Sequence, residues 1–331
     1  MPNTASIARR TGTPQPRSGD QAVVTPDRAN ARDFGPFTLV RVLAEGGLGI
    51  VFSAVHRVTA RQVALKTVSP DYRERFKLTA EQVTQLFFNE ARVMAALDHP
   101  SLLPLYDAGH VAPTGQTSIP YLAMRLVAGG DLWGRVQSRG PVAEREALRM
   151  VHDAALGLQA MHEAGWVHAD IKPANLLLEV DGRVRISDFG NAQQLGSLPP
   201  PGAIAGTPSY LAPEQIDGRA LREAIDLYAL GATMHFALTG RPPYQAGSVS
   251  DTIIAIRSAQ HPPDPRELIP DLGQEVAAIV MRAMHPNPDG RYGSAKQLVH
   301  DCQCVLNGQA PAYAVDFAGR RRSGIFRSLF T

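Results

Sequence analysis

The chain lacks most of the features that would place it in a membrane or outside the cell. It has only two cysteines, Cys302 and Cys304, and their C-x-C spacing strains a disulfide, so we interpret them as reduced thiols. No apolar run reaches the ~18 residues of a membrane span, and the N-terminus has no apolar segment typical of a secretory signal. The predicted compartment is the cytoplasm.

The chain also has no large excess of charge of either sign. The 33 Lys and Arg residues nearly balance the 31 Asp and Glu residues, for a formal net charge of +2, and they are scattered except near the two ends. No nucleic-acid partner is therefore expected. Lysine itself is rare, with four residues at Lys66, Lys77, Lys172 and Lys296. A lysine inside an apolar strand is costly, so its position carries information.

The composition is that of a soluble globular protein, with 44% hydrophobic and 19% charged residues. Residues 1–35 are rich in Pro, Thr, Ser, Arg and Ala and are predicted to be a disordered arm. Residues 308–331 are predicted to be a flexible basic tail. Its arginines, Arg320, Arg321, Arg322 and Arg327, could contact an anionic membrane or a partner protein, but a solvated tail is the favoured interpretation.

Hydrophobic periodicity predicts an α+β fold with two lobes between residues 36 and 307. Residues 37–68 alternate β-branched and polar side chains, which indicates three antiparallel strands. A helix follows, with a capping box of Thr79 and Gln82. One face of it is predicted to hold Val83, Leu86, Phe87, Glu90, Met94 and Leu97. Gly129 and Gly130 indicate a hinge, so we expect a β-rich lobe at 36–127 and an α-rich lobe at 128–307.

A glycine-rich stretch separates the first two predicted strands. It reads Ala44-Glu45-Gly46-Gly47-Leu48-Gly49. Glycines there let the backbone approach a ligand closely and point its N–H groups at phosphate. An ordinary β-turn explains such a stretch about as well, so the motif is weak evidence taken alone.

Lys66 and Glu90 form the first candidate pair. Lys66 lies in the apolar strand VALKTV, two residues after Ala64, so both side chains face the same side. Glu90 lies on the apolar stripe of the following helix, where an unpaired carboxylate would be expensive to bury. We therefore expect Glu90 to bind Lys66. The alternatives are a surface lysine on an edge strand and a glutamate at the border of the stripe, in water.

A hairpin supplies a candidate metal site. Leu176, Leu177 and Leu178 are predicted to form a strand, Asp181-Gly182 a two-residue turn, and Val184 with Ile186 the returning strand. In that register Leu177 pairs with Ile186 and Asn175 with Asp188, roughly 4.5 to 5.5 Å apart. An amide oxygen and a carboxylate so placed suit Mg²⁺. Either residue alone would more often be a turn former.

Asp170 and Lys172 lie in the loop before this hairpin, within HADIKPAN at 168–175. Asp170 could accept a proton from an incoming hydroxyl while Lys172 steadies a transferring phosphoryl group. A plain surface loop could hold both residues, but Pro173 favours a shaped, non-helical loop.

These motifs in this order resemble the eukaryotic-like protein kinases, and specifically the serine/threonine kinases of bacteria. The resemblance covers Phe37 to Leu306, almost the whole predicted folded part. It rests on GGLG, VALK, Glu90, HADIKPAN, DFG at 188–190, GTPSYLAPE, DLYALG from Asp226, and Arg291. It implies the bilobal protein kinase fold, with a nucleotide cleft between the lobes.

The resemblance also implies roles for the site residues. Lys66 would bind the α and β phosphates of ATP and pair with Glu90, Asp170 would be the catalytic base with Lys172 beside it, and Asn175 and Asp188 would hold Mg²⁺ or, alternatively, Mn²⁺. The nucleotide-contacting residues would be Ala44, Gly46, Gly47, Gly49, Val51, Ala64, Lys66, Met124, Arg125, Val127 and Leu177. Met94, His168 and Phe189 would stack above Asp226, whose carboxylate would accept N–H groups of the catalytic loop. Glu214 and Arg291 resemble an ion pair that fixes the substrate-binding segment.

Two departures from the family pattern concern regulation. Ala169 stands where regulated members carry the arginine that binds an activation-loop phosphate. The corresponding loop, Asn191 to Gly206, has Ser197 as its only hydroxyl. We therefore predict an active kinase that does not depend on activation-loop phosphorylation and is ordered by packing, helped by Pro199, Pro200 and Pro201. A third departure lies in the phosphate loop, whose first glycine is replaced by Ala44.

Lys172 and Thr207 in GTPSY resemble the pattern of kinases that phosphorylate serine and threonine in proteins. Protein substrates are thus expected. Autophosphorylation of hydroxyls in the N-terminal arm is one alternative, and an unmodified solvated arm the more favoured one. The competing interpretation of the whole chain is a pseudokinase scaffold that binds nucleotide or partners without turnover. Ala44 and Ala169 favour it, whereas Lys66, Glu90, Asp170, Asn175 and Asp188 oppose it.

Overall fold

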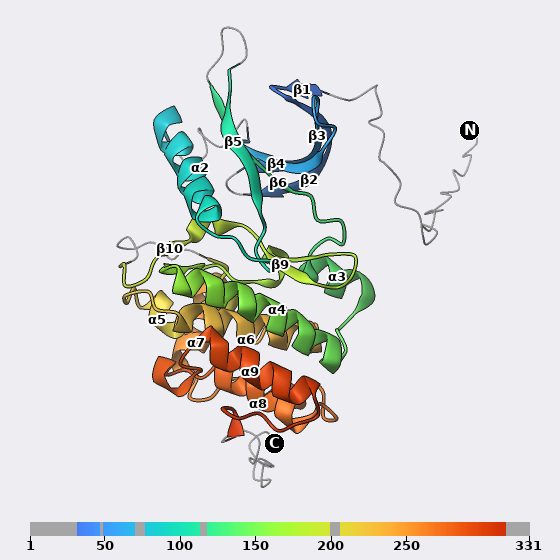
Figure 1. The fold of residues 1–331 in the computed structure, drawn as a ribbon. Helices are drawn as coiled ribbons and strands as arrows, with labels where there is room; N and C mark the ends of the chain where they lie inside the picture. Colours follow the sequence, from blue (N-terminus) through green and yellow to red (C-terminus); the bar gives the residue numbers. More distant parts are fainter. Residues whose placement is uncertain (1–31, 47–48, 70–76, 113–117, 199–205, 316–331) are drawn as a thin grey trace, which may run out of the picture.

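The structure is a computed structural model that describes residues 32–46, 49–69, 77–112, 118–198 and 206–315 (Figure 1). Most of the predicted N-terminal arm and residues 316–331 of the predicted tail lie outside these ranges. An antiparallel sheet with one long helix forms the upper lobe in Figure 1, and helices form most of the lower lobe. The predicted α+β bilobal architecture is therefore confirmed.

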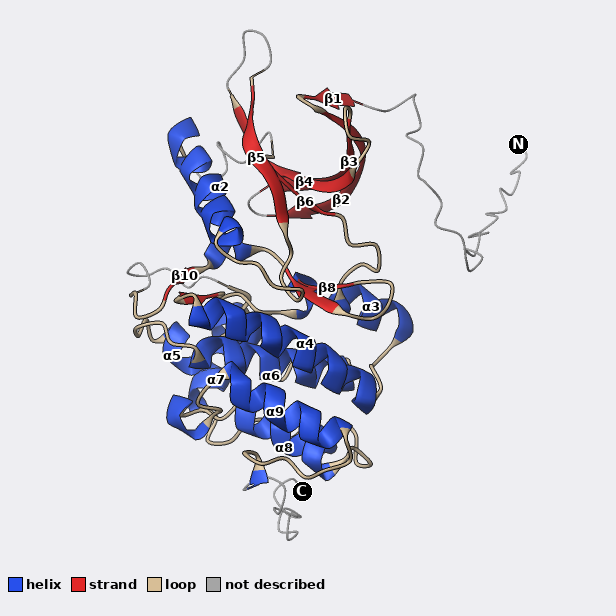
Figure 2. Ribbon diagram, in the orientation of Figure 1, coloured by secondary structure: helices blue, strands red, loops and turns tan. Residues whose placement is uncertain are grey.

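The upper lobe is a six-stranded antiparallel sheet with the strand order β1-β2-β3-β4-β6-β5 (Figure 2). Its strands are β1 Arg32–Phe34, β2 Phe37–Gly46, β3 Gly49–His56, β4 Gln62–Thr67, β5 Leu105–Val111 and β6 Ile119–Arg125. The three strands predicted within residues 37–68 correspond to β2, β3 and β4. Strand β1 pairs with β2, so ordered structure begins before the boundary predicted at residue 36.

Side-chain alternation gives the sheet two different faces. Val63 and Leu65 pack with Phe37 and Tyr121 in a small apolar cluster on one face. The intervening residues of β4 point the other way, and Lys66 lies opposite Leu122 of β6 in the strand register. The second face is therefore the one that carries Lys66 towards α2 and the lower lobe.

Helix α2, Ala80–Ala95, packs against that second face. Thr79 accepts a hydrogen bond from the Gln82 N–H, and the Gln82 side chain accepts one from the Thr79 N–H, so the predicted capping box is confirmed. Val83, Phe87, Glu90 and Met94 are buried as expected. The prediction was wrong for Leu86, which is 40% exposed. The part of the α2 surface that is buried is narrower than the stripe formed by its apolar residues.

The lower lobe is built around α6, Ala224–Thr239. Every residue of α6 from Ala224 to Leu238 is buried, which is typical of a helix enclosed on all sides. The other helices of this lobe are α3 Leu132–Arg139, α4 Glu144–Glu163, α5 Pro213–Ile216, α7 Val249–Ser258, α8 Gln274–Ala283 and α9 Ala295–Leu306, of which α4 and α8 pack directly on α6. Within the described ranges, no helix is long and apolar enough to cross a membrane.

Strands β8, Leu176–Leu178, and β9, Val184–Ile186, form the predicted hairpin, but in a different register. Leu177 pairs with Arg185, whereas the sequence predicted Ile186. The Glu179 N–H binds the Arg183 carbonyl, so three residues form the loop, with Gly182 at φ 85°. The two-residue turn was therefore wrong, and the whole pairing is shifted by one residue.

Packed structure continues past the boundary predicted at residue 307. The carboxylate of Asp301 in α9 is buried and accepts the N–H groups of Ala312, Tyr313 and Ala314 at 2.7 to 3.2 Å. Ala314 is itself completely buried. We call residues 309–314 the C-terminal strap. The prediction of a flexible tail from residue 308 was wrong for this strap, because a buried carboxylate binds its backbone.

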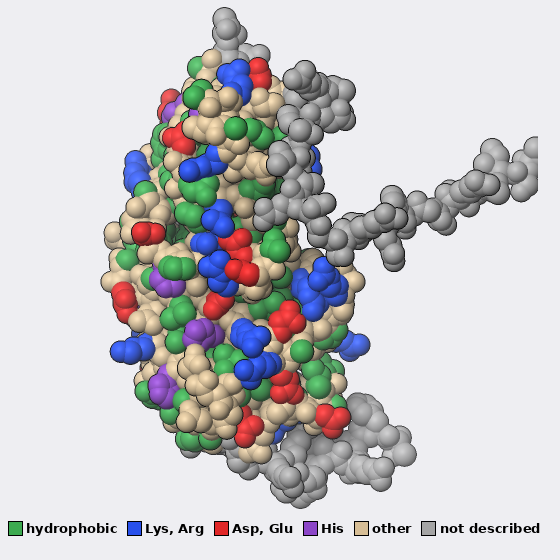
Figure 3. All heavy atoms as spheres, turned by 45° about the vertical axis from the view of Figure 1, so that its right-hand side comes forward, with side chains coloured by type: hydrophobic (Ala, Val, Ile, Leu, Met, Phe, Trp, Pro, Cys, Tyr) green, Lys and Arg blue, Asp and Glu red, His purple; other side chains and the backbone are tan. Residues whose placement is uncertain are grey.

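The described surface mixes both charge signs. On the face drawn in Figure 3, Lys and Arg side chains lie among Asp and Glu side chains, and apolar side chains are scattered between them. This distribution agrees with the near balance of charge in the sequence.

Candidate active site

Lys66 is the centre of an ion-pair cluster between the two lobes. Its Nζ lies 2.9 and 2.8 Å from the two carboxylate oxygens of Glu90 on α2. The same Nζ lies 2.9 Å from Oδ1 of Asp188, which follows β9 in the lower lobe. The expected Lys66–Glu90 pair is therefore present, with both side chains buried, and the alternatives of a surface lysine or a solvated glutamate are excluded.

The charges in this cluster are strongly coupled. Burial alone would lower the pKa of Lys66, but the carboxylates of Glu90 and Asp188 raise it above its ordinary value. Burial raises the pKa of Glu90, and Lys66 opposes that shift. Asp188 also feels burial, but the Lys66 ammonium outweighs it and lowers its pKa. Lys66 therefore stays positively charged at neutral pH.

Asp170 is held in position by donors on one side of its carboxylate. Its Oδ2 accepts a hydrogen bond from Lys172 Nζ at 2.7 Å. Longer contacts of 3.4 Å reach Oδ2 from the amides of Asn175 and Asn191. Gly206 lies against the other oxygen, since a Cβ at that position would be 3.4 Å from Oδ1. The carboxylate is buried yet oriented, as a proton acceptor needs to be.

Asp226 organises the backbone that precedes Asp170. Its two carboxylate oxygens accept the N–H groups of His168 and Ala169, each at 2.8 Å. His162 of α4 lies 2.9 Å from the same carboxylate. These donors outweigh the effect of burial and lower the pKa of Asp226. The predicted anchoring role of Asp226 is therefore matched by its contacts.

Two of the three residues predicted to stack above Asp226 are in ring contact. The rings of His168 and Phe189 are 5.4 Å apart, edge to face, and Met94 belongs to the same buried cluster. His168 Nδ1 faces the Asp170 N–H at 3.3 Å, while Nε2 donates to the Ser187 carbonyl at 3.1 Å.

Asn175 and Asp188 lie near one another, although not as the paired residues predicted. The Ser187 N–H donates to the Asn175 carbonyl, so Ser187 and not Asp188 stands opposite Asn175. The Asn175 amide donates to the Asp170 carbonyl at 2.8 Å, which leaves its side-chain oxygen as an available ligand. The Asp188 side chain is 40% exposed, and Lys66 contacts its Oδ1, so Oδ2 is available as a second ligand. These oxygen ligands fit a hard divalent cation.

Residues predicted to contact the nucleotide come from β2, β3, β4, β6 and β8. In the sheet register Ala44 lies opposite Val51, and Ala64 lies opposite Met124. Arg125 ends β6, Val127 follows it, and Leu177 lies in β8 below. Gly46 and Gly49 close the β2–β3 ladder, whereas Gly47 lies outside the described residues.

Gly49 has a clear packing requirement. A Cβ at this position would lie 2.1 Å from the carbonyl oxygen of Thr67, so no other residue fits without moving β4. Packing of β3 on β4 therefore explains this glycine without a ligand.

Glu214 of α5 and Arg291 form the buried ion pair that the resemblance implied. Two hydrogen bonds of 2.6 and 2.8 Å join them, and Arg291 also donates to the Ala224 carbonyl. This pair ties the segment that follows the activation loop to the body of the lower lobe.

Four contacts of the site were not predicted from the sequence. Asn191 approaches Asp170, Gln215 donates to the Ala169 carbonyl, and Glu179 accepts hydrogen bonds from both Arg125 and Arg185. Asn191, Gln215 and Glu179 are of residue types that are common on protein surfaces. No local pattern marked them.

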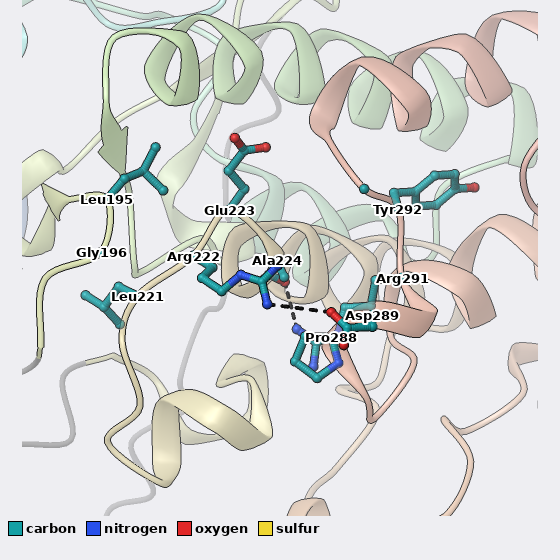
Figure 4. A pocket seen from close by; sticks show the side chains of 11 residues that line it. Leu195, Gly196, Leu221, Arg222, Glu223, Ala224, Pro288, Asp289, Arg291 and Tyr292 are labelled. Carbon is teal, nitrogen blue, oxygen red and sulfur yellow. Dashed lines mark hydrogen bonds and ion pairs between the residues drawn. The ribbon is translucent and has the colours of Figure 1, made fainter.

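A cavity of about 350 Å³ lies elsewhere in the lower lobe, beside Leu195, Leu221 and Tyr292. Arg222 and Asp289 point towards one another at one side of it (Figure 4). Of the residues given roles in the sequence analysis, Arg291 alone lines this cavity, and none of the predicted catalytic, nucleotide-contacting or metal-binding residues does. Among the described residues, no cluster of three or more His, Cys, Asp or Glu side chains could hold a metal ion.

Comparison with known proteins places these features in context. A family profile described as the protein kinase domain matches residues 37–302. Serine/threonine-protein kinase PknB of Mycolicibacterium smegmatis is 34% identical over 284 residues, which cover 83% of this chain and 44% of PknB. Serine/threonine-protein kinase PknA of Mycobacterium tuberculosis is 34% identical over 285 residues, which cover 84% of this chain and 63% of PknA. The chain thus spans roughly half the length of these relatives.

Proposed function

Because this chain belongs to the protein kinase family, we propose that it transfers the γ-phosphoryl group of ATP to serine and threonine hydroxyls of proteins. One observation carries the proposal: Lys66 is bound by Glu90 and by Asp188, and the residue before Asp188 is hydrogen-bonded to Asn175, in the same loop as Asp170 and Lys172. A scaffold without turnover would not need to bury and pair all of these charges.

Each residue has a task in this reaction. Lys66, kept positive by its two carboxylates, binds the α and β phosphates. Asp170 accepts the proton of the substrate hydroxyl, and Lys172 stabilises negative charge on the transferring group. Asn175 and Asp188 would hold Mg²⁺ or Mn²⁺, which neutralises phosphate charge when bound. The backbone of Arg125 and Val127 would bind adenine between Val51, Ala64 and Leu177.

The proposed acceptor class rests on two arguments. Lys172 lies 2.7 Å from Asp170, in the position that the resemblance associates with serine/threonine acceptors. The relatives PknB and PknA are named as serine/threonine-protein kinases. The Glu214–Arg291 pair supports a protein substrate, because it fixes the segment on which a peptide would lie.

Label transfer from ATP tests the proposal against the pseudokinase alternative. Purified protein is incubated with Mg²⁺, labelled ATP and a generic basic protein acceptor, beside Asp170→Asn. We expect transfer to serine and threonine, reduced about 10²- to 10⁴-fold in the variant, since the proton acceptor is lost. Nucleotide binding without transfer by the wild-type protein would instead establish the scaffold.

We also propose that activity does not need a phosphorylated activation loop. Ser197 donates to the Gln194 carbonyl at 2.7 Å, and Ala169 supplies no charge for a phosphate. The triple proline lies outside the described residues, so its part in ordering the loop stays a prediction. Phosphatase treatment and Ser197→Ala should each leave kcat within about twofold of wild type. A collapse of activity in either case would refute this independence.

We further propose that the protein is cytoplasmic, and that phosphorylation of its own N-terminal arm can be tested directly. The dependence on ATP and the two free thiols, Cys302 and Cys304, support a cytoplasmic protein. The hydroxyls of the N-terminal arm lie outside the described residues. Mass spectrometry after incubation with ATP alone would show whether they accept phosphate.

A further inference from the structure

Ala169, the residue before the proposed base, is held in an unfavourable backbone conformation. Its φ is 62°, in the left-handed region that L residues other than Gly, Asn and Asp seldom adopt. Its N–H donates to Asp226, which fixes one side of the residue. A second contact is needed to hold the peptide group that joins Ala169 to Asp170.

Gln215 supplies that second contact. Its Nε2 donates to the carbonyl oxygen of Ala169 at 2.9 Å, and both side chains are buried. The Asp170 N–H of the same peptide group has only a long 3.3 Å contact with His168 Nδ1. The hydrogen bond from Gln215 is therefore the shorter of the two bonds that set the plane of the peptide leading into Asp170.

Gln215 comes from the segment on which a protein substrate would lie. It is the residue after Glu214 in the short helix α5, and Glu214 is tied to Arg291 in the body of the lobe. Consecutive side chains of α5 thus reach in two directions. One anchors the segment to the lobe, and the other reaches the catalytic loop.

We propose that Gln215 is a positioning residue that couples the substrate-binding segment to Asp170 through the backbone of Ala169. It takes the place of the arginine and phosphate contact that the sequence lacks. A misplaced segment would lose this hydrogen bond and leave the carbonyl buried and unpaired, which is costly. The inference rests on the proposed kinase activity of the same site.

The first test replaces Gln215 by methionine, which has a similar length and no donor. We expect kcat to fall about tenfold, because Asp170 loses its orientation. The KM for ATP should stay within about twofold, since the nucleotide contacts are elsewhere. Gln303→Met, at an exposed position of α9, is the matched control and should retain wild-type kcat.

The second test uses the pH dependence of Gln215→Glu, which a merely structural role would not produce. A protonated glutamic acid can donate to the Ala169 carbonyl, whereas the carboxylate repels it. Burial near the carboxylates of Asp170 and Asp226 raises the pKa of the introduced carboxyl group, and the Tyr210 hydroxyl beside them stays un-ionised in this pH range and adds no charge. The ratio of variant to wild-type kcat should therefore increase as the pH is lowered from 8.5 to 6.

The outcomes separate the two proposals. No transfer by the wild-type protein defeats the kinase function itself. Wild-type transfer with an unchanged kcat in Gln215→Met overturns the role of Gln215. If Gln215→Met is poorly folded, the Gln215→Glu ratio decides: an increase at low pH supports the coupling, and a flat ratio overturns it.

Discussion

Ala169 is an alanine in a position that favours glycine. The left-handed conformation costs a residue with a Cβ about 1–2 kcal/mol, while glycine loses about 0.5–1 kcal/mol of unfolded-state entropy. We therefore expect Ala169→Gly to raise the free energy of unfolding by about 0.5–1 kcal/mol. Urea denaturation measures it.

The matched control is Ala160→Gly, the same change at a half-buried position of α4. Because Ala160 has helical geometry, this variant should lose about 1 kcal/mol. If both substitutions changed the free energy of unfolding in the same direction, the backbone strain inferred at Ala169 would be contradicted.

Lys66 contributes to stability and to activity in different ways. Lys66→Met leaves Glu90 buried without its partner, and breaking such a pair costs about 3–5 kcal/mol. The double variant Lys66→Met, Glu90→Gln removes both charges and should recover much of that loss. Label transfer should stay abolished in both variants. Recovery of transfer in the double variant would contradict the phosphate-binding role of Lys66.

The Lys66–Glu90 contact could be predicted because a carboxylate on an apolar helix stripe needs a cation. The contact of Lys66 with Asp188 could not, since it joins residues 122 positions apart across the two lobes. The contact of Gln215 could not be predicted either, because it depends on where the fold places the carbonyl oxygen of Ala169.

At the scale of elements, the β8–β9 hairpin has a register that the sequence pattern alone could not predict. An Asp-Gly pair fits both a two-residue turn and the end of a three-residue loop whose glycine has positive φ. The structure has the second form, with Gly182 at φ 85°. The strands themselves were predictable from Leu176–Leu178 and Val184–Ile186, whereas their register depended on one turn residue.

The central helix α6 contains a histidine that should make stability depend on pH. His235 is 2% exposed, and burial lowers its pKa below the ordinary value. In the unfolded chain it takes up a proton below about pH 6.5, but in the folded protein it does so only at lower pH. The free energy of unfolding should therefore fall as the pH decreases from 7 towards 5.

His235→Gln removes this titration and should flatten the dependence, as measured by urea denaturation at several pH values. Burial shifts the pKa of His99 in the same direction, so some slope should remain. His261→Gln, at an exposed position, is the control and should keep the wild-type slope. An unchanged slope in His235→Gln would rule out its contribution.

At the scale of the whole molecule, the C-terminal strap extends the lower lobe beyond α9. Asp301 accepts three backbone N–H groups of the strap and the Tyr292 hydroxyl. Asp301→Asn replaces an acceptor oxygen by a donor and should cost about 2–4 kcal/mol of stability. Thermal and urea denaturation would measure the loss.

Truncation tests whether this cost arises from the strap. In a chain that ends at Asn307 the strap donors are gone, so Asp301→Asn should cost much less. In a chain that ends at Val315 the donors remain, and the full cost should persist. Equal costs in both truncated chains would place the effect of Asp301 elsewhere.

Hydrophobic periodicity predicted both lobes, and the order of the motifs predicted the fold that joins them, because each motif had a known place in the resembled fold. The strap was missed for a physical reason. Apart from Tyr313, its residues are Gln309, Pro311 and three alanines, and they are ordered by backbone hydrogen bonds to one carboxylate, which leave no hydrophobic period to detect.

The scarcity of lysine has a practical consequence for labelling. Lys66 and Lys172 are engaged by carboxylates, and the raised pKa of Lys66 keeps it protonated and unreactive towards acylating reagents. Lys77 and Lys296 are exposed. Amine-directed dyes or surface immobilisation will therefore attach to those two side chains first and leave the two lysines of the proposed active site unmodified.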